Sequence, residues 1–263
     1  MNFVNITLEG LIFSNILVIG TMLITLLFST KFQWKILIAA IRTFGQLLIV
    51  GYFLRYIFKN DSWYSSMGTL LAMHFAAGFI CLDAVGLSYR NMDFLMACFI
   101  SIAAGMALTF VITNIFVIHF KPWYRADYLV PLSGMVIGNS ITAISLYHKN
   151  VISSIQKRRS FIQSLIAMGI EGKKAISGFT SEGFQTGLMP TITAMLMLGI
   201  VKLPGMMTGQ IIGGSEVMQA IYYQIVVMFM IAFSSAVSML LFRWMHGRLI
   251  FDKDSFLREK IIS

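Results

Sequence analysis

Long apolar segments separated by short polar ones dominate the sequence. Four of them run without interruption, over residues 8–28, 36–58, 67–87 and 94–118. An α-helix needs about 20 apolar residues to cross a hydrocarbon core about 30 Å thick, so each segment is long enough to span a membrane. Three further segments have the same character: 128–147, 188–212 and 219–244. The pattern predicts an all-α, polytopic membrane protein with about seven transmembrane helices.

One segment between the spans is long, polar and basic, and it covers residues 148–187. Within it Phe161, Ile162 and Leu165 recur at helical spacing with polar residues between them, which is typical of an amphipathic helix. We interpret the segment as a cytoplasmic helical hairpin within a single permease domain, 1–263. A basic helix that rests on anionic lipid headgroups is the alternative interpretation.

Composition supports the membrane assignment. Hydrophobic residues make up 57% of the chain and charged residues only 12%, whereas a soluble domain carries roughly 25% charged residues. The net charge is +9, which in a soluble protein would suggest nucleic-acid binding. In a membrane protein the same excess marks cytoplasmic loops, and no nucleic-acid partner is expected.

The distribution of Lys and Arg predicts the orientation, because positively charged loops are retained in the cytoplasm. With the N-terminus outside, the inner side holds Lys31, Lys35, Arg90, Lys149, Lys157, Arg158, Arg159, Lys173, Lys174, Arg243, Arg248, Lys253, Arg258 and Lys260. We therefore expect a cytoplasmic C-terminus in a bacterial inner membrane. The first segment has no basic region before it and carries Glu9, so we expect a retained span and not a cleaved signal peptide.

Two polar residues lie inside the second span. Arg42 and Gln46 are four residues apart, so they project from one helix face. Charged groups inside a span usually face a polar interior, which favours a role in lining a transport pathway. An arginine near the inner end of a helix can also extend to lipid phosphate, and this alternative remains open.

A metal site is weakly indicated. His74, Cys81 and Asp83 offer N, S and O ligands in the third span, but Asp83 is displaced around the helix from the other two. We interpret His74 as a hydrogen-bonding group within the bundle, and Cys81 and Cys98 as small buried hydrophobic residues. Most of the 19 methionines are assigned to core packing. Metal ligands are therefore left unassigned.

The fifth and sixth spans combine proline and glycine with polar side chains. Pro131 and Gly138 interrupt one span, and Pro190, Gly199 and Pro204 the other. Broken helices at membrane depth are tolerated where they line a water-filled cavity or are buried in protein. We predict that these spans form a translocation route, and that its lining residues are Arg42, Gln46, Asn139, Thr142, Thr191, Thr208 and Gln210.

Several motifs are absent from the sequence. The chain contains no G-x-x-x-x-G-K-[ST] phosphate-binding loop, no G-x-S-x-G and no H-E-x-x-H. An intramembrane enzyme is therefore disfavoured, and an ATP-driven transporter would need its ATPase on another chain. A secondary carrier that works without ATP is the alternative, but no carboxylate lies convincingly in mid-membrane to couple an ion.

One run of residues is specific enough to indicate a family. Residues 203–212 read Leu-Pro-Gly-Met-Met-Thr-Gly-Gln-Ile-Ile, and 223–229 read Tyr-Gln-Ile-Val-Val-Met-Phe. Further matches lie at 41–43, 46–48, 131–140 and 190–192. In these positions the chain resembles the FetB-type permeases, a family that includes plant aluminium-sensitivity transporter subunits.

This resemblance implies a permease that pairs with a separate ABC-type ATPase, as two permeases with two ATPases in the lipid membrane. It implies export of iron or another metal ion, with nucleotide-sugar transport as the alternative. ATP with Mg²⁺ would bind to the partner, so no cofactor is expected on this chain.

The resemblance also implies that the hairpin docks the ATPase and moves during alternating access. The coupling residues would be Leu165, Met168, Gly169, Glu171, Lys174 and Ala175. The chain departs from the family pattern here, because Gln163-Ser164 replaces a usual Glu-Ala and Lys174 stands where an acidic residue is common. Further departures near the pathway are Thr193, Lys202 and Tyr222.

Overall fold

The structure is a computed structural model that describes residues 8–27, 32–59, 62–86, 92–119 and 121–251. The described residues are helical almost throughout, and the β-structure among them is a single isolated bridge between Leu198 and Lys202. The chain divides into two compact units, residues 1–61 and 62–263. The prediction of an all-α membrane protein is confirmed.

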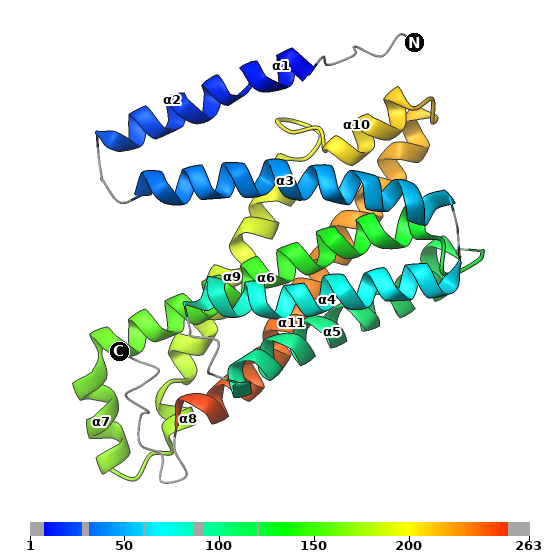
Figure 1. The fold of residues 1–263 in the computed structure, drawn as a ribbon. Helices are drawn as coiled ribbons and strands as arrows, with labels where there is room; N and C mark the ends of the chain where they lie inside the picture. The colour runs from blue at the N-terminus through cyan, green and yellow to red at the C-terminus, as the bar shows by residue number, and fades with distance from the viewer. Residues whose placement is uncertain (1–7, 28–31, 60–61, 87–91, 120, 252–263) are drawn as a thin grey trace. The chain divides into compact units, whose positions relative to one another are not determined.

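The described part of the N-terminal unit consists of apolar helices: a short one, α1 (Leu8–Phe13), and two longer ones, α2 (Asn15–Leu26) and α3 (Phe32–Lys59). Helix α2 packs along α3 (Figure 1). Almost all described side chains here are exposed, including large apolar ones such as Leu17, Leu27 and Trp34. Helices that are hydrophobic on all sides are typical of membrane spans, because lipid covers what the protein does not.

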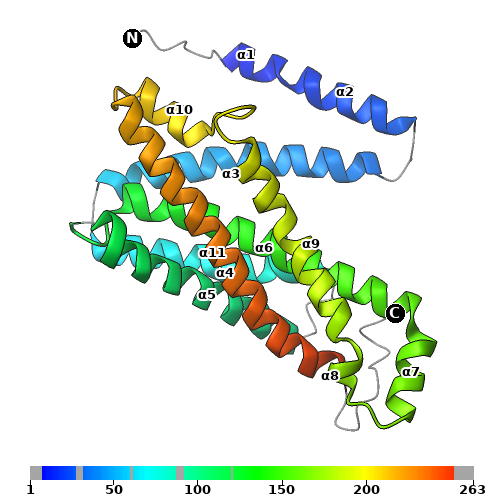
Figure 2. The same ribbon diagram turned by 180° about the vertical axis from the view of Figure 1, so that it is seen from behind.

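The second unit is a helical bundle. Its long helices are α4 (Trp63–Val85), α5 (Met92–Thr113, continued by a π-helical turn, Asn114–Ile118), α6 (Ala126–Lys157), α9 (Ser177–Met197) and α11 (Val217–Ile250). Three short helices connect them: α7 (Arg159–Ala167), α8 (Gly172–Ala175) and α10 (Gly205–Ile212). Figure 2 shows α9 and α11 side by side, and both pack against α6.

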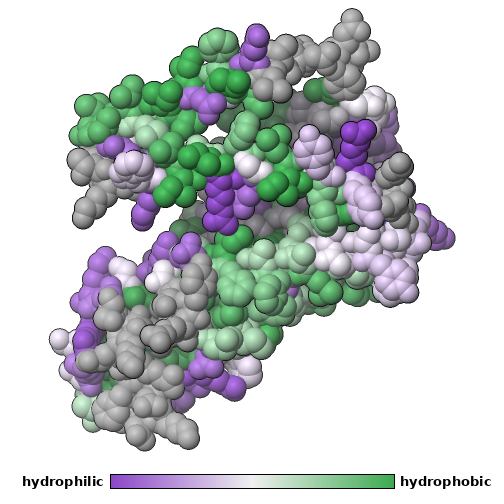
Figure 3. Space-filling model, viewed as in Figure 1, coloured by the Kyte–Doolittle hydropathy of each residue, from purple (hydrophilic) through white to green (hydrophobic). Residues whose placement is uncertain are grey.

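Six helices of the described residues are long and apolar enough to cross a membrane: Glu9–Leu26, Gln33–Phe58, Trp63–Val85, Met92–Ile118, Ala126–Lys157 and Val217–Ile250. Figure 3 shows hydrophobic side chains over α4, and hydrophilic ones gathered where α6 ends and α7 begins. The chain is therefore a multi-pass membrane protein. The count of seven spans and their orientation stay predictions.

The predicted sixth span, 188–212, is not one helix. Helix α9 begins at Ser177, inside the segment predicted to be cytoplasmic, and ends at Met197. The chain then turns through Gly199, whose φ is +77°, before α10 begins. The predicted break is confirmed at Gly199 and Pro204 but is wrong at Pro190, which lies inside α9. The helix begins before the predicted span, where polar residues such as Thr180 are buried against neighbouring helices.

The predicted break in the fifth span is wrong, since α6 runs continuously through Pro131 and Gly138. Pro131 lies in the second turn of the helix, where it removes one hydrogen bond without ending the helix. The predicted cytoplasmic segment, 148–187, stays a prediction. Its first ten residues continue α6 to Lys157, because Val151 and Ile155 are fully buried in the core.

Two glycines bring α9 into direct contact with the backbone of α6. A Cβ atom on Gly183 would lie 3.2 Å from the Tyr147 carbonyl oxygen, and one on Gly187 would lie 2.7 Å from that of Ala143. Higher numbers on α9 thus meet lower numbers on α6, so the two helices are antiparallel. Small residues spaced four apart allow this close approach in membrane helices, where lipid offers no hydrophobic drive for association.

We predict that Gly187→Ala destabilises the bundle by about 1–3 kcal/mol, because the new methyl group overpacks a backbone contact. Gly178→Ala is the matched control on the same helix, since nothing lies within 4 Å of a Cβ there. Thermal unfolding of the purified protein in detergent measures both. Equal stability of the two variants would contradict the proposed close contact.

Candidate functional site

Helix α6 carries an unusual polar stripe in the middle of a membrane-length helix. Gly138 and Thr142 are exposed and Asn139 is half-buried, and their spacing of three to four residues puts them on one face. Asn139 Nδ2 donates to the Met135 carbonyl at 2.8 Å, and Thr142 Oγ1 donates to that of Gly138 at 3.0 Å. Polar groups are costly against lipid, so this stripe is suited to face a polar route or another protein surface.

The other predicted lining residues lie in different places. Thr191 is buried in α9, whereas Thr208 and Gln210 are half-buried on α10, where Thr208 Oγ1 donates to the Pro204 carbonyl at 3.0 Å. Arg42 and Gln46 are exposed on α3 of the N-terminal unit. The structure therefore places Asn139 and Thr142 on one face, while a common lining by all seven residues stays a prediction.

A buried serine cluster joins α5, α6 and α11. Ser140 Oγ lies 3.2 Å from Ser234 Oγ and accepts a hydrogen bond from Ser238 Oγ at 3.3 Å. Gly105 of α5 packs directly against Ser238 and the Ser234 carbonyl. Sequence analysis missed this cluster because its members are 94 and 98 residues apart and no local pattern marks them.

Two histidines form a second buried link between α6 and α11. His148 Nδ1 and His246 Nε2 are 2.7 Å apart, and both side chains are buried. The rings of Phe94, Tyr147 and Phe242 surround them, with Phe242 stacked on His246 at 5.1 Å between ring centroids. The pair also escaped sequence analysis, since 98 residues separate its members.

The residues considered for a metal site do not form one. His74 Nε2 lies 3.1 Å from the Phe99 carbonyl oxygen, which confirms its interpretation as a hydrogen-bonding group in the bundle. Cys81 and Cys98 are free and fully buried, as predicted, and Asp83 is exposed. Across the described ranges, no group of three or more His, Cys, Asp and Glu side chains is placed to hold a metal ion.

The segment from α7 to α8 is anchored to the ends of the long helices. Ile162 of α7 and Ile176 at the end of α8 are buried in the main core together with Ile250 of α11. Gly172 rests on the ring of Phe251, so closely that a Cβ there would lie 2.7 Å from Phe251 Cε1. A displacement of this segment would therefore act directly on α6, α9 and α11.

The predicted coupling residues divide into anchoring and exposed groups. Leu165 and Ala175 are half-buried, and Ala175 packs against the core, whereas Met168, Gly169, Glu171 and Lys174 are exposed. Gly169 has a φ of +89° and ends α7 in a tight turn. At this turn the Met168 side chain is 69% exposed and that of Ile170 37% exposed. The turn, residues 168–170, is called the apolar tip from here on.

Comparison with known proteins supplies the context for this geometry. Residues 8–251 match the model of an uncharacterised protein family, UPF0014. The chain is 31% identical over 244 residues to the "Probable iron export permease protein FetB" of Escherichia coli, covering 90% of each protein. It is 31% identical to the "UPF0014 membrane protein YjkA" of Bacillus subtilis, covering 80% of this chain and 82% of the relative.

A plant protein is also similar. The Arabidopsis thaliana "Protein ALUMINUM SENSITIVE 3" is 27% identical over 223 residues, which cover 84% of this chain and 79% of the relative. No solved structure matches the chain.

We predict that His148→Leu and His246→Leu each destabilise the bundle by about 1–3 kcal/mol, because each leaves the other imidazole buried without its partner. The double variant should lose less than the sum of the two, since no unpaired ring nitrogen of the pair then remains. Thermal unfolding in detergent measures the stability of the original chain, the two single variants and the double variant. Additive losses would show that the two rings do not interact.

Proposed function

Because the chain belongs to the UPF0014 family of membrane proteins, we propose that it is the membrane subunit of an ATP-driven metal exporter whose ATPase is a separate chain. The family includes membrane permeases, so the chain itself is a transport protein and not an enzyme. The motif that an ATPase needs is absent from its sequence. A partner chain would therefore supply ATP hydrolysis, and two copies of the permease would pair with two ATPases.

The segment that runs from the start of α7 to the end of α8, residues 159–176, is called the anchored segment and carries this proposal. A coupling element must expose a surface to its partner and must be rigidly joined to the helices that move. The apolar tip supplies the exposed surface, and the burial of Ile162, Gly172 and Ile176 supplies the rigid joint. Exposed methionine is common at adaptable binding surfaces, which suits docking of a protein partner.

The route for the substrate would run along the polar stripe of α6 and past the break between α9 and α10. A shift of the anchored segment would tilt α6, α9 and α11 and so open the route alternately to each side. Asn139 and Thr142 would line it on α6, with Thr208 and Gln210 near the break. The assignment of Arg42, Gln46 and Thr191 rests on the sequence.

Iron is the proposed substrate because a relative that shares 31% of residues is named as a probable iron export permease. A route must hold its ion weakly enough to release it. Hydroxyl and amide oxygens on α6 and α10 meet this requirement better than a closed cluster of His, Cys and carboxylate ligands, and the described residues contain no such cluster.

We predict that Met168→Asp reduces co-purification of this chain with its ATPase by at least roughly tenfold. Burying a carboxylate in an apolar contact weakens the binding free energy between the two chains by more than about 1.4 kcal/mol. The measurement is affinity purification after co-expression with the ABC ATPase that is proposed as its partner. Ile200→Asp is the control, since Ile200 is 88% exposed in the turn between α9 and α10 and outside the proposed contact. Retained association of the Met168 variant would contradict docking at the apolar tip.

A further inference from the structure

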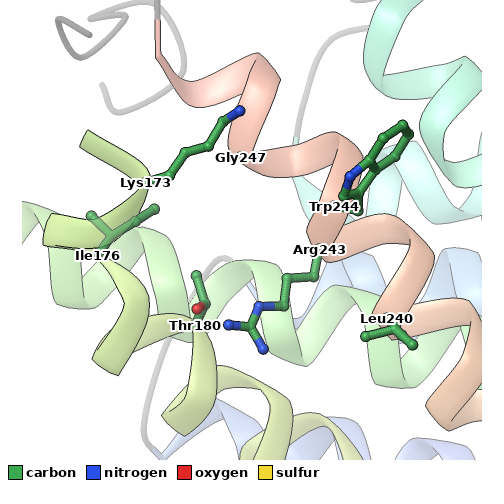
Figure 4. Close-up of a pocket in the computed structure, with 7 residues that line it drawn as sticks. All are labelled: Lys173, Ile176, Thr180, Leu240, Arg243, Trp244 and Gly247. Carbon is green, nitrogen blue, oxygen red and sulfur yellow. The ribbon is translucent and has the colours of Figure 1, made fainter. Parts of the chain in front are cut away.

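A basic cavity lies where α8, α9 and α11 meet, away from the proposed route. It has a volume of about 340 Å³. Its polar lining comes from Lys173 of α8, Thr180 of α9 and Arg243 of α11, and its apolar lining includes Ile176 and Leu240 (Figure 4). Three separate elements thus contribute polar groups to one largely apolar cavity, at the end of the bundle that carries the anchored segment.

Within the described residues, no carboxylate pairs with the cations of the cavity. Neither Lys173 nor Arg243 takes part in an ion pair there. Thr180 donates its hydroxyl hydrogen to the Ser177 carbonyl at 2.8 Å, so its oxygen can still accept a hydrogen bond. Figure 4 shows the Arg243 guanidinium beside Thr180, while the Lys173 ammonium points away from it towards Gly247. A guanidinium next to a hydroxyl oxygen, with a second cation in the same lining, favours an anion with several oxygens, and phosphate fits this pattern.

The residue types along one face of α11 indicate where the cavity lies relative to the membrane boundary. Leu240, Trp244 and Arg248 are four residues apart and form one stripe, in which Leu240 is 56% and Trp244 61% exposed. The Arg248 guanidinium lies 3.9 Å above the Trp244 ring centroid. The change from leucine through tryptophan to arginine along one face is typical of the boundary between hydrocarbon and headgroups. The cavity opens at this boundary, because Leu240 and Trp244 also line it.

The aliphatic part of Lys173 packs against α11. Its Cγ lies 3.8 Å from where a Cβ of Gly247 would be, and its Cδ and Cε lie 4.0 Å from the same point. The side chain therefore runs along the surface of α11 next to Gly247, as Figure 4 shows. Lys173 is exposed, so its ammonium is free to change direction.

We propose that this cavity binds the phosphate of an anionic phospholipid, whose acyl chains lie along the exposed apolar stripe of α11. The phosphate binds to the Arg243 guanidinium and the Thr180 hydroxyl, and the exposed Lys173 side chain turns towards it. Binding itself needs no ATPase and does not depend on the proposed transport activity. Its effect on coupling rests on the proposed function, because α8 belongs to the segment that would dock the ATPase.

The test is a lipid titration of the purified chain in detergent, without ATPase, followed by thermal unfolding. Phosphatidylglycerol should raise the melting temperature, and phosphatidylcholine or inorganic phosphate should not. The double variant Lys173→Gln/Arg243→Gln should weaken the apparent affinity for phosphatidylglycerol by roughly tenfold or more, since two charged hydrogen bonds are lost. Lys149→Gln, which removes an exposed cation of α6 outside the cavity, should leave this affinity unchanged.

A second variant separates loss of binding from loss of folding. Lys173→Arg/Arg243→Lys keeps both charges and should keep the preference for phosphatidylglycerol. Equal stabilisation by phosphatidylcholine would overturn the proposal of an anionic lipid, and equal stabilisation by inorganic phosphate would replace the lipid with a soluble anion. An unchanged affinity in the glutamine variant would show that the lipid binds elsewhere. None of these outcomes depends on whether the chain exports iron.

Discussion

Direct backbone contact between α6 and α9 is the constraint on which the rest of the second unit depends. Lipid is as apolar as a leucine side chain, so helices in a membrane associate through close packing and hydrogen bonds and not through the hydrophobic effect. Gly183 and Gly187 permit this contact, and the serine cluster links α6 to α11 by hydrogen bonds between side chains. Because of it, Thr180 and Thr191 of α9 are buried against protein, and residues of the segment from α7 to α8 share the core of the three helices.

The features that the sequence did not predict depend on this same close packing between helices. The first four spans could be predicted because lipid-facing helices are apolar on all sides, and the structure has helices there. The full extent of α9 was not predicted, because its neighbours, and not its own hydrophobicity, bury Thr180. The continuation of α6 to Lys157 was also not predicted, since Val151 and Ile155 are interspersed with polar residues and resemble an amphipathic helix.

The candidate site was predictable only in part. Asn139 and Thr142 could be found because a local spacing puts them on one helix face. The serine cluster, the histidine pair and the basic cavity depend on contacts between helices that are far apart in sequence, and one chain gives no signal for them. The anchored segment would link the two proposed partners, because its apolar tip is exposed while Lys173 lines the basic cavity. Docking and lipid binding would therefore act on the same short stretch of chain.

The central claim is that this chain carries iron outward when a separate ATPase hydrolyses ATP. Its most direct test is the iron content of cells lacking both proteins, compared with cells that re-express both. The account predicts high iron that falls on re-expression, and that stays high when the ATPase is inactive or when Asn139 is replaced by Leu. Iron content that does not respond to the pair would contradict the claim and would favour an organic substrate such as a nucleotide sugar.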